Sequence, residues 1–327
     1  MKDFCIVGSG ISGSNIANHL SKKYKVEIFE KAKGLGGRAS NRRYLKKLSF
    51  DHGLQYLTAK TKEFNRFLIR LEGEKILKVW KGHHLNLDLK KRNNLTKYIG
   101  KNANNDISKS LLKRKNIKIN KFVSIKSINF KLGYWEITLG NNRKINFKNV
   151  ILTCPYAQSK NLSKKYLKKE IEKLNVKMTP NITVMLVYKS NKQPPISSIS
   201  FNDKILRWAA NENSKKRFTS KLNLWTLQSD STWAKKVINK YKNNRISVMN
   251  LIINRFLKFT GFQKSKIIFK NIHGWKYAYN NKPTKIKSYY SRQYKLGICG
   301  DWFLGPKAEN AWLSSEDLFK KIKKNPV

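Results

Sequence analysis

The stretch CIVGSGISGSNIANHL, residues 5–20, runs from an apolar segment through three glycines into a helix-like pattern. The apolar segment predicts a short buried strand, and the spacing of apolar residues after the glycines predicts a helix. In a dinucleotide site, Gly8 makes the tight turn, Gly10 lets the backbone approach the pyrophosphate, and Gly13 allows the helix to pack closely on the strand. The helix that starts near Ser12 would point its unpaired N–H groups at the phosphates. The stretch therefore predicts a dinucleotide-binding turn.

The next apolar strand supports this prediction, which glycine spacing alone supports only weakly. It has the sequence VEIFE, residues 26–30, and ends in an acid 20 residues beyond Gly10. A carboxylate at this place accepts hydrogen bonds from a ribose, so Glu30 is the expected ribose ligand. The alternative is a tight strand-to-helix turn followed by an ordinary surface glutamate. The order of strand, glycines, helix and acid favours the dinucleotide.

The composition is strongly basic. The 327 residues include 70 lysines and arginines against 19 aspartates and glutamates, a formal net charge of +51. Such an excess is typical of proteins that bind nucleic acid or an anionic membrane surface. The lysines are spread along the whole chain among many asparagines and isoleucines, so we expect a compositional habit and no specific nucleic-acid site. A hydrophobic content of 40% and an aromatic content of 12% predict a folded chain with a substantial core.

The three cysteines, Cys5, Cys154 and Cys299, lie far apart in apolar, strand-like segments. Their odd number and the absence of a Cys-x-x-Cys pair predict reduced thiols, with neither a disulfide framework nor a metal site. No apolar run approaches the ~18 residues of a membrane span, and glycines interrupt the first one, unlike in a signal peptide. The expectation is a soluble, cytoplasmic protein without a metal.

Just beyond the expected ribose ligand, the sequence KAKGLGGR, residues 31–38, ends in two glycines and an arginine. This ending resembles the second signature of FAD-binding proteins in the amine oxidase superfamily. The resemblance implies that Lys31, Gly36 and Gly37 lie against the cofactor and that Arg38 meets its phosphates as a forked donor. NAD-only dehydrogenases usually lack this signature, so FAD is the expected dinucleotide.

Near the other end of the chain, LGICGDW, residues 296–302, reads as a strand that ends in Gly-Asp, and a helix pattern opens at ENAWLSSEDL. The pair resembles the last FAD motif of the same superfamily. The resemblance implies that Gly300 and Asp301 bind the ribityl chain, and that the helix start, with Ala311 and Trp312, faces the pyrimidine end of the flavin. A helix N-terminus stabilises the negative charge of a reduced flavin. The alternative for Asp301 is a turn or helix cap.

Four further stretches extend the resemblance over nearly the whole chain. They are FDHGLQYLT (50–58), RWAANENSK (207–215), LWTLQSDSTWA (224–234) and HGWKYA (273–278). They resemble segments of a renalase-like subgroup of the FAD-dependent amine oxidase superfamily, with Leu54 standing where the subgroup has a small residue. The resemblance implies that Gly53 and Gln55 contact the flavin.

The fold implied by this resemblance is α/β, with a discontinuous Rossmann-like FAD-binding domain and a second, mostly antiparallel β substrate domain. The FAD-binding domain would comprise residues 1–75, 103–160 and 272–327. The substrate domain would comprise residues 76–102 and 161–271 and would cover the flavin. The strand-like runs between the cofactor motifs agree with this division.

The reaction implied is hydride transfer from a small substrate to N5 of a non-covalently bound FAD, followed by reoxidation by oxygen or another acceptor. Gln55, Tyr56, Trp275 and Tyr277 are the expected catalytic residues, although Trp275 and Tyr277 could instead belong to the core. Hydride transfer needs no strong base, so structural hydrogen bonding is the expected role of the histidines at positions 52 and 273.

The resemblance implies two substrate classes. Renalase-type enzymes oxidise off-pathway dihydronicotinamide dinucleotide isomers, whereas amine oxidases take amines or polyamines. The high net positive charge and the small number of acidic residues favour an anionic dinucleotide as substrate over a polyamine. Two alternatives stay open: a basic flavoprotein that binds nucleic acid, and a peripheral membrane oxidoreductase without a transmembrane segment that takes a lipophilic donor.

Overall fold

The first strand and helix form on either side of the three glycines. They are β1 (Lys2–Val7) and α1 (Ile11–Leu20), and β2 (Val26–Glu30) follows with every residue buried. Burial of all five residues is expected of a strand inside a parallel sheet. The predicted strand, turn, helix and second strand are therefore confirmed. The structure is a computed structural model that describes residues 1–87, 95–190, 194–241 and 243–324.

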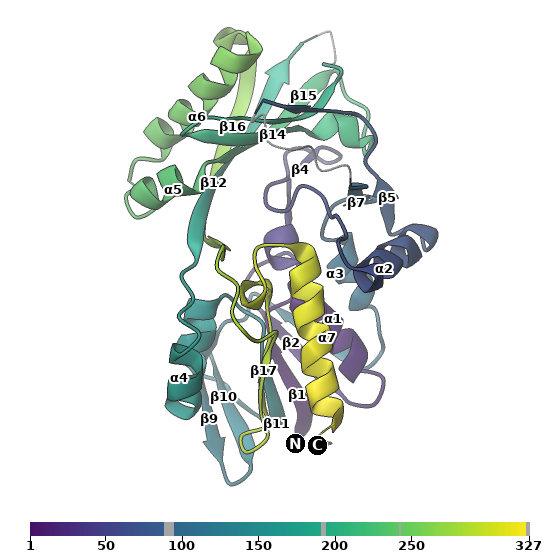
Figure 1. Ribbon diagram of the computed structural model, residues 1–327, viewed down its shortest axis with the longest axis vertical. Coiled ribbons are helices and arrows are strands. Elements are labelled where there is room, and N and C mark those ends of the chain that lie inside the picture. The colour runs from purple at the N-terminus through teal and green to yellow at the C-terminus, as the bar shows by residue number, and fades with distance from the viewer. Residues whose placement is uncertain (88–94, 191–193, 242, 325–327) are drawn as a thin grey trace.

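The larger sheet of the described chain is mostly parallel and lies in the lower half of Figure 1. β1 pairs in parallel with β2 on one side and with β11 (Lys144–Leu152) on the other, and β11 pairs in parallel with β18 (Leu296–Ile298). The other strands of this sheet are β8 (Ile117–Lys121), β9 (Ile125–Lys131), β10 (Tyr134–Leu139) and β17 (Tyr289–Ser291). The parallel pairing brings the carboxyl ends of strands from both ends of the sequence to one edge.

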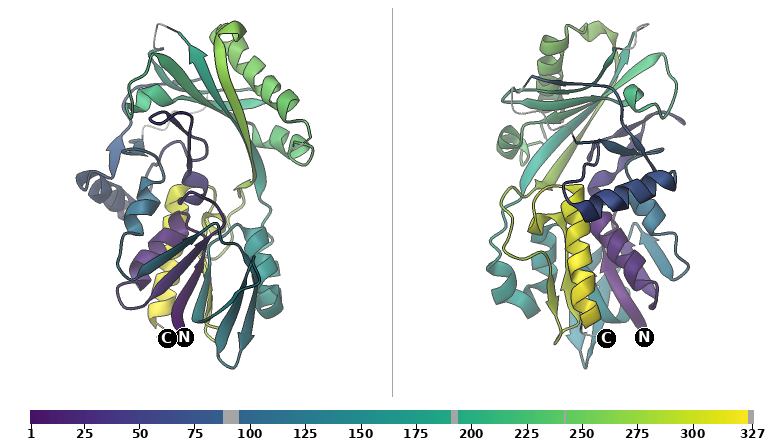
Figure 2. Two further views of the ribbon diagram at one scale, coloured as in Figure 1. Left: turned by 180° about the vertical axis from the view of Figure 1, so that it is seen from behind. Right: turned by 45° about the vertical axis from the view of Figure 1, so that its right-hand side comes forward.

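Helices cover both faces of this sheet, as the two views of Figure 2 show. On one face, α1 and α7 (Ala308–Lys324) pack through Ile16, Leu20 and Leu318 against β1 and β2. On the other face, α4 (Tyr156–Glu172) packs with the β9–β10 hairpin around Trp135. This layering is that of a Rossmann-like domain.

A second sheet forms the upper half of Figure 1, and its strands are antiparallel except for one parallel edge pair. Its strands, in spatial order, are β16 (Ile267–Tyr279), β12 (Thr179–Lys189), β15 (Leu222–Ser229), β14 (Leu206–Asn211), β13 (Ile196–Ser200) and β6 (His83–Asn86). α5 (Ser231–Val237) and α6 (Arg245–Thr260) pack on its outer face, where Phe256 contacts Trp225. The opposite face of the sheet is turned toward the first sheet.

Short elements fill the region between the two sheets. They are β3 (Asn41–Arg43), β4 (Ser49–Asp51), α2 (Lys62–Gly73), β5 (Leu77–Val79), β7 (Tyr98–Gly100) and α3 (Asp106–Leu111). β3 and β4 form an antiparallel hairpin. In Figure 1, β4 lies beneath the second sheet.

The α/β fold with a Rossmann-like part and a mostly antiparallel second sheet is as predicted. The expected domain boundaries at residues 160 and 271 fall inside α4 and β16, respectively. α4 packs on the first sheet, whereas the whole of β16 belongs to the second. The division into domains remains a prediction.

All three cysteines are buried and free, and they lie in strands of the first sheet or within two residues of a strand end. Burial raises the pKa of the Cys154 thiol to about 11 and raises the pKa values of Cys5 and Cys299 further. Across the described part of the chain, no helix combines the length and apolarity needed to cross a membrane.

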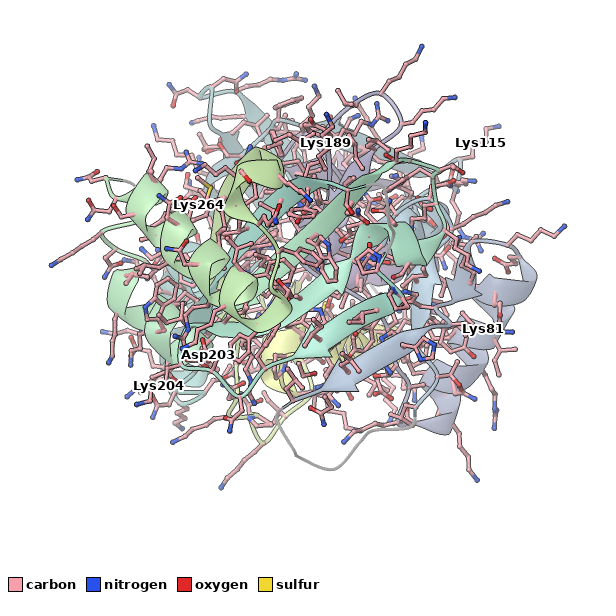
Figure 3. All side chains as sticks on the ribbon, turned by 90° about the horizontal axis from the view of Figure 1, so that it is seen from above. Lys81, Lys115, Lys189, Asp203, Lys204 and Lys264 are labelled. Atoms are coloured by element: carbon pink, nitrogen blue, oxygen red, sulfur yellow. The ribbon has the colours of Figure 1, made fainter. Side chains whose placement is uncertain are left out.

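The positive charge is distributed over the surface. In Figure 3, Lys81, Lys115, Lys189, Lys204 and Lys264 lie at widely separated points of the molecule, and all of them are exposed. A nucleic-acid site would be a localised footprint. The distribution supports the view that much of the charge is compositional.

Candidate active site

A cleft of about 1900 Å³ runs between the two sheets. One wall is the edge where the parallel strands β1, β2, β11 and β18 end, and the other wall comes from β12, β14, β15 and β16. Ligands of open α/β sheets bind outside the carboxyl ends of the strands. The cleft therefore lies where this fold binds ligands.

The glycine turn between β1 and α1 leaves open space beside Gly10. A Cβ atom on Gly13 would lie 2.1 Å from the Gly8 carbonyl oxygen, so close packing of helix on strand requires glycine there. A Cβ on Gly10 would meet no atom within 4 Å, and no side chain caps the start of α1. Thr153, which follows the neighbouring strand β11, donates a hydrogen bond from its hydroxyl to the Val7 carbonyl oxygen at 2.9 Å and so stabilises the turn. The open side and the uncapped helix start suit a phosphate group.

The Glu30 carboxylate lies at the end of β2 and lines the cleft. It accepts hydrogen bonds from the Ser9 backbone N–H at 3.0 Å, the Ser9 hydroxyl at 2.8 Å and the Ala32 N–H at 2.8 Å. A carboxylate offers about four acceptor positions, so one remains for a ligand hydroxyl. Lys31 follows directly, exposed at the cleft margin.

The segment with Gly36, Gly37 and Arg38 closes over the glycine turn. The Gly36 N–H donates to the Ser9 carbonyl oxygen at 3.0 Å, and a Cβ on Gly37 would lie 3.2 Å from the Gly10 Cα. Arg38 forms an ion pair with Asp301, 263 residues away, and donates to the Ala278 carbonyl oxygen at 2.6 Å. The second and last predicted motifs therefore meet across the cleft, where Gly300 also lines the wall.

The start of α7 contributes Ala311 to the cleft, but Trp312 turns away from it. The Ser12 hydroxyl, another lining group, donates to the Ala311 carbonyl oxygen at 2.8 Å. The Trp312 ring stacks on Phe67, with centroids 5.3 Å apart, in the cluster beneath α2. The ring of Trp312 points away from the cleft because neighbouring residues of a helix point about 100° apart, and the flavin contact expected of this residue stays a prediction.

The segment from Asp51 to Tyr56 is the seam between the two sheets. The Trp275 indole N–H donates to the His52 carbonyl oxygen at 2.9 Å, and the Gln228 amide donates to the Gly53 carbonyl oxygen at 2.6 Å. The Gln55 amide donates to the carbonyl oxygens of Asp51 and Gly53. Gly53 and Gln55 line the cleft, as does Tyr56.

Behind this seam lies a buried charge cluster of Asp51, Glu212, Lys215 and Arg217. The Lys215 ammonium is fully buried, 2.8 Å from an Asp51 carboxylate oxygen and 3.0 Å from Glu212. Arg217 also pairs with Asp51. Burial alone would raise the pKa of Asp51, but Arg217 and Lys215 hold it well below its usual range, whereas burial raises the pKa of Glu212.

Three rings, His52, His273 and Trp275, contact one another on the cleft wall. The His52 ring stacks on Trp275 with centroids 5.2 Å apart, and the His273 ring meets Trp275 at 4.3 Å and His52 at 5.1 Å. Burial, the neighbouring histidine and the Arg42 charge lower the pKa of His52 to about 3. Burial, Arg42 and Arg245 lower the pKa of His273 to about 4. Both rings are therefore neutral at pH 7.

Aromatic residues continue this wall on either side. Tyr56 lies between Trp80 and Trp208, with centroid distances of 6.1 and 5.7 Å, and burial raises its pKa. Tyr277 lines the cleft beside Tyr279, whose pKa is raised to about 12 by burial against a smaller opposing effect of Arg38. Trp275 and Tyr277 are cleft residues rather than core residues.

Some of these features have little or no signal in the sequence. The buried charge cluster joins residues 164 positions apart. Lys215 ends the RWAANENSK stretch that carries the resemblance, but nothing in that stretch shows that its ammonium is buried. Thr153 follows an apolar strand, which is the one hint that it lies at the cleft edge. In the described residues, no group of three or more histidines, cysteines or acids is arranged to hold a metal ion.

The comparisons with known proteins agree with this architecture. Residues 6–71 match the family model described as an NAD(P)-binding Rossmann-like domain. The whole chain is similar to a protein from Exiguobacterium sp. 255-15 provisionally assigned as a protoporphyrinogen oxidase, at 10% identity and a TM-score of 0.77 over 99% of each chain. It is also similar to wild-type putrescine oxidase bound to putrescine, at 10% identity and a TM-score of 0.69 over 99% of this chain and 98% of that one.

A third similar structure is an oxidoreductase from Methanosarcina mazei, at 14% identity and a TM-score of 0.65 over 98% of this chain and 100% of that one. At such identities the likeness concerns the fold. The chain therefore has the fold of these proteins, with a Rossmann-like dinucleotide-binding part and an antiparallel sheet across the cleft.

Proposed function

We propose that the protein is an FAD-dependent oxidoreductase of the renalase-like amine oxidase type. It would transfer a hydride from a small substrate to the flavin. One observation carries the proposal: glycines, Glu30, Arg38 and Asp301 from opposite ends of the sequence line a single cleft whose other wall is aromatic. The similarity to solved oxidases and to an NAD(P)-binding Rossmann-like domain supports it.

The residues present fit FAD. The open space beside Gly10 and the uncapped start of α1 would take the pyrophosphate, and the remaining acceptor position of Glu30 would take a ribose hydroxyl. Asp301 and the start of α7 would face the ribityl chain and the ring. Cys154 also lines the cleft, but its raised pKa keeps the thiol protonated, in agreement with non-covalent binding.

Bound FAD would supply a two-electron acceptor at N5. The chain's task is then to hold the donor carbon there and to exclude water. Trp275, Tyr277 and Tyr56 form the wall that can do this, and Gln55 is fixed in place by its hydrogen bonds to backbone carbonyls. His52 and His273 are neutral at pH 7, so the wall adds no charge of its own.

A dihydronicotinamide dinucleotide isomer is the substrate to test first. Loss of a hydride from its ring gives the oxidised nicotinamide, and oxygen as acceptor would take two electrons and two protons to become hydrogen peroxide. The acids that line the described cleft are Glu30 and Asp301, and both already have partners. A diamine would therefore find no free carboxylate on the aromatic wall.

The visible spectrum of the purified protein, followed by anaerobic addition of the 2- and 6-dihydro isomers of NAD(P), tests the proposal. Flavin bands that bleach with an isomer and return in air would support it, with peroxide as the co-product. Bands that persist with the isomers but bleach with putrescine would move the substrate to the amines. A colourless protein that cannot be reconstituted with FAD would overturn the proposal.

Two variants test the cofactor ligands. Glu30→Ala and Asp301→Ala should each weaken FAD retention by about tenfold or more, the value of a lost hydrogen bond to a charged group. Glu63→Ala, which removes an exposed carboxylate on α2, is the matched control and should retain flavin like the wild type. A variant at position 30 or 301 that stays fully loaded would remove that residue from the site.

A further inference from the structure

The β3–β4 hairpin brings a group of cations to the aromatic end of the cleft. Arg42, Arg43, Lys46 and Lys47 all line it. Arg42 differs from the other three because its charge acts on both His52 and His273 and lowers their pKa values. Arg42 pairs with Phe50 across the hairpin, two residues before His52, and it lines the same cleft as His52 and His273.

The Arg42 guanidinium has no hydrogen-bond or ion-pair partner among the residues that the structure describes. Two other arginines near the cleft behave differently, since Arg38 pairs with Asp301 and Arg217 pairs with Asp51. The histidines beside Arg42 are neutral at pH 7 and offer no compensating charge. Arg42 is exposed at the cleft wall, so its fork is accessible to an anion that the protein does not itself provide.

The ring cluster next to Arg42 shows a second unsatisfied group. His52 is 5% exposed, and its Nδ1 atom is buried without a hydrogen-bond partner in the described structure. Buried polar atoms of this kind are usually satisfied by a ligand or an ordered water. The other ring nitrogen of His52 lies 3.4 Å from the Ser40 hydroxyl, so the imidazole is held in place on one side only.

We infer that the substrate carries a carboxylate or phosphate group that Arg42 binds, while the attached ring lies against His52, His273 and Trp275. This inference rests on the proposed function and makes Arg42 a specificity-determining residue of that site. A forked guanidinium matches a planar carboxylate or a phosphate with two parallel hydrogen bonds. A cationic substrate would meet Arg42 and three more cations of the hairpin.

Four small probes that share a benzene ring and differ in the charge of the attached group test the inference. They are benzoate, phenyl phosphate, neutral benzamide and cationic benzylamine. Their binding to the purified protein is measured by titration calorimetry and by the perturbation of flavin absorbance, at fixed ionic strength. We expect at least one anion to bind more tightly than benzamide. Arg42→Gln should weaken that anion by about tenfold or more and leave benzamide unchanged.

A matched control separates local recognition from the general positive field. Arg66→Gln removes the same charge from an exposed position of α2 that does not line the cleft, and it should change anion affinity by less than about twofold. Arg42→Lys keeps the charge without the fork and should recover only part of the affinity. Thermal unfolding of each variant establishes that it is folded. The anion that loses more affinity in Arg42→Gln identifies the group as carboxylate or phosphate.

Equal anion binding by Arg42→Gln and wild type would overturn the inference. Equal weakening by Arg42→Gln and Arg66→Gln, or tighter binding of benzylamine than of either anion, would do the same. Calorimetry also separates this inference from the proposed function. Arg42-dependent anion binding by a protein that cannot hold flavin would sustain the subsite and overturn the flavin proposal, whereas a flavoprotein without such binding would do the reverse.

Discussion

The two ends of the cleft differ in the groups that form their walls. At the glycine end, formed by residues 8–13 and 36–38, backbone groups and glycines shape the wall. At the ring end, formed by His52, His273 and Trp275, side chains from separate segments make the wall, and a buried charge cluster lies behind it. A wall of backbone excludes added atoms, whereas a wall of side chains depends on what holds those side chains. The two ends should therefore fail in different ways when they are changed.

The largest expected effect comes from breaking the support of the ring end. Among the described residues, Lys215→Met would leave the buried Glu212 without an ion-pair partner and Asp51 with Arg217 alone, and removal of one member of a buried ion pair costs about 3–5 kcal/mol. Urea unfolding at pH 7 measures this loss. Lys264→Met, at an exposed position, should unfold like the wild type. Equal midpoints for both variants would mean that the cluster contributes nothing to stability.

An intermediate effect should separate two glycines of the glycine end. Gly13→Ala places a methyl group against the Gly8 carbonyl oxygen and should cost about 1–3 kcal/mol, as overpacking does. Gly10→Ala meets open space at an ordinary φ of −66°, so it should unfold like the wild type but retain less FAD. Thermal unfolding without added FAD and the flavin content after purification measure both properties. A fully loaded Gly10→Ala protein would show that the cofactor does not pass beside this residue.

The smallest expected effect is a change in pH dependence at the ring end. The pKa of His52 is about 3, below the ordinary 6.5, so the unfolded chain binds a proton at moderately acid pH that the folded chain does not. The contribution of His52 to the free energy of unfolding is therefore fully present above pH 6.5, and it is lost as the pH falls toward 3. His52→Gln should remove about 1 kcal/mol of this loss per pH unit below about pH 5.5. Urea midpoints between pH 6.5 and 4.5 test it, with the exposed His83→Gln as control; parallel curves for all three proteins would contradict it.

The difference between the two ends also explains which parts of the cleft could be predicted from the sequence. The glycine end follows from local rules, because the backbone geometry of a strand, tight turn and helix requires glycines at fixed spacing, and the acid at position 30 follows one strand later. Arg38 and Asp301 each lie in a short local motif, so both were predictable, although their pairing across 263 residues was not.

The ring end could be predicted only in part. Trp275 and Tyr277 were suggested by a motif on a strand whose alternate residues face one side. Arg42 carries no local signal in a chain with 70 basic residues, and the RWAANENSK stretch that ends in Lys215 does not reveal that this lysine is buried, because burial and missing partners are properties of the folded structure. The direction of the Trp312 ring could not be read from the motif, because Ala311 faces α1 and the next residue along the helix already faces α2.

The placement of the cysteines gives the molecule a built-in chemical reporter. Only a thiolate reacts readily with thiol reagents, and the three sulfurs are buried with raised pKa values, so the native chain should react slowly. Cys5 lies in a strand of the first sheet, Cys154 and Cys299 lie within two residues of the ends of its strands, and the strands of the second sheet contain no cysteine. The rate of thiol labelling in dilute urea would therefore record the opening of the dinucleotide-binding part alone, while the antiparallel sheet stays silent. A fluorescence change that precedes labelling, and that is absent from the Trp225→Phe variant, would reveal that the two parts unfold separately.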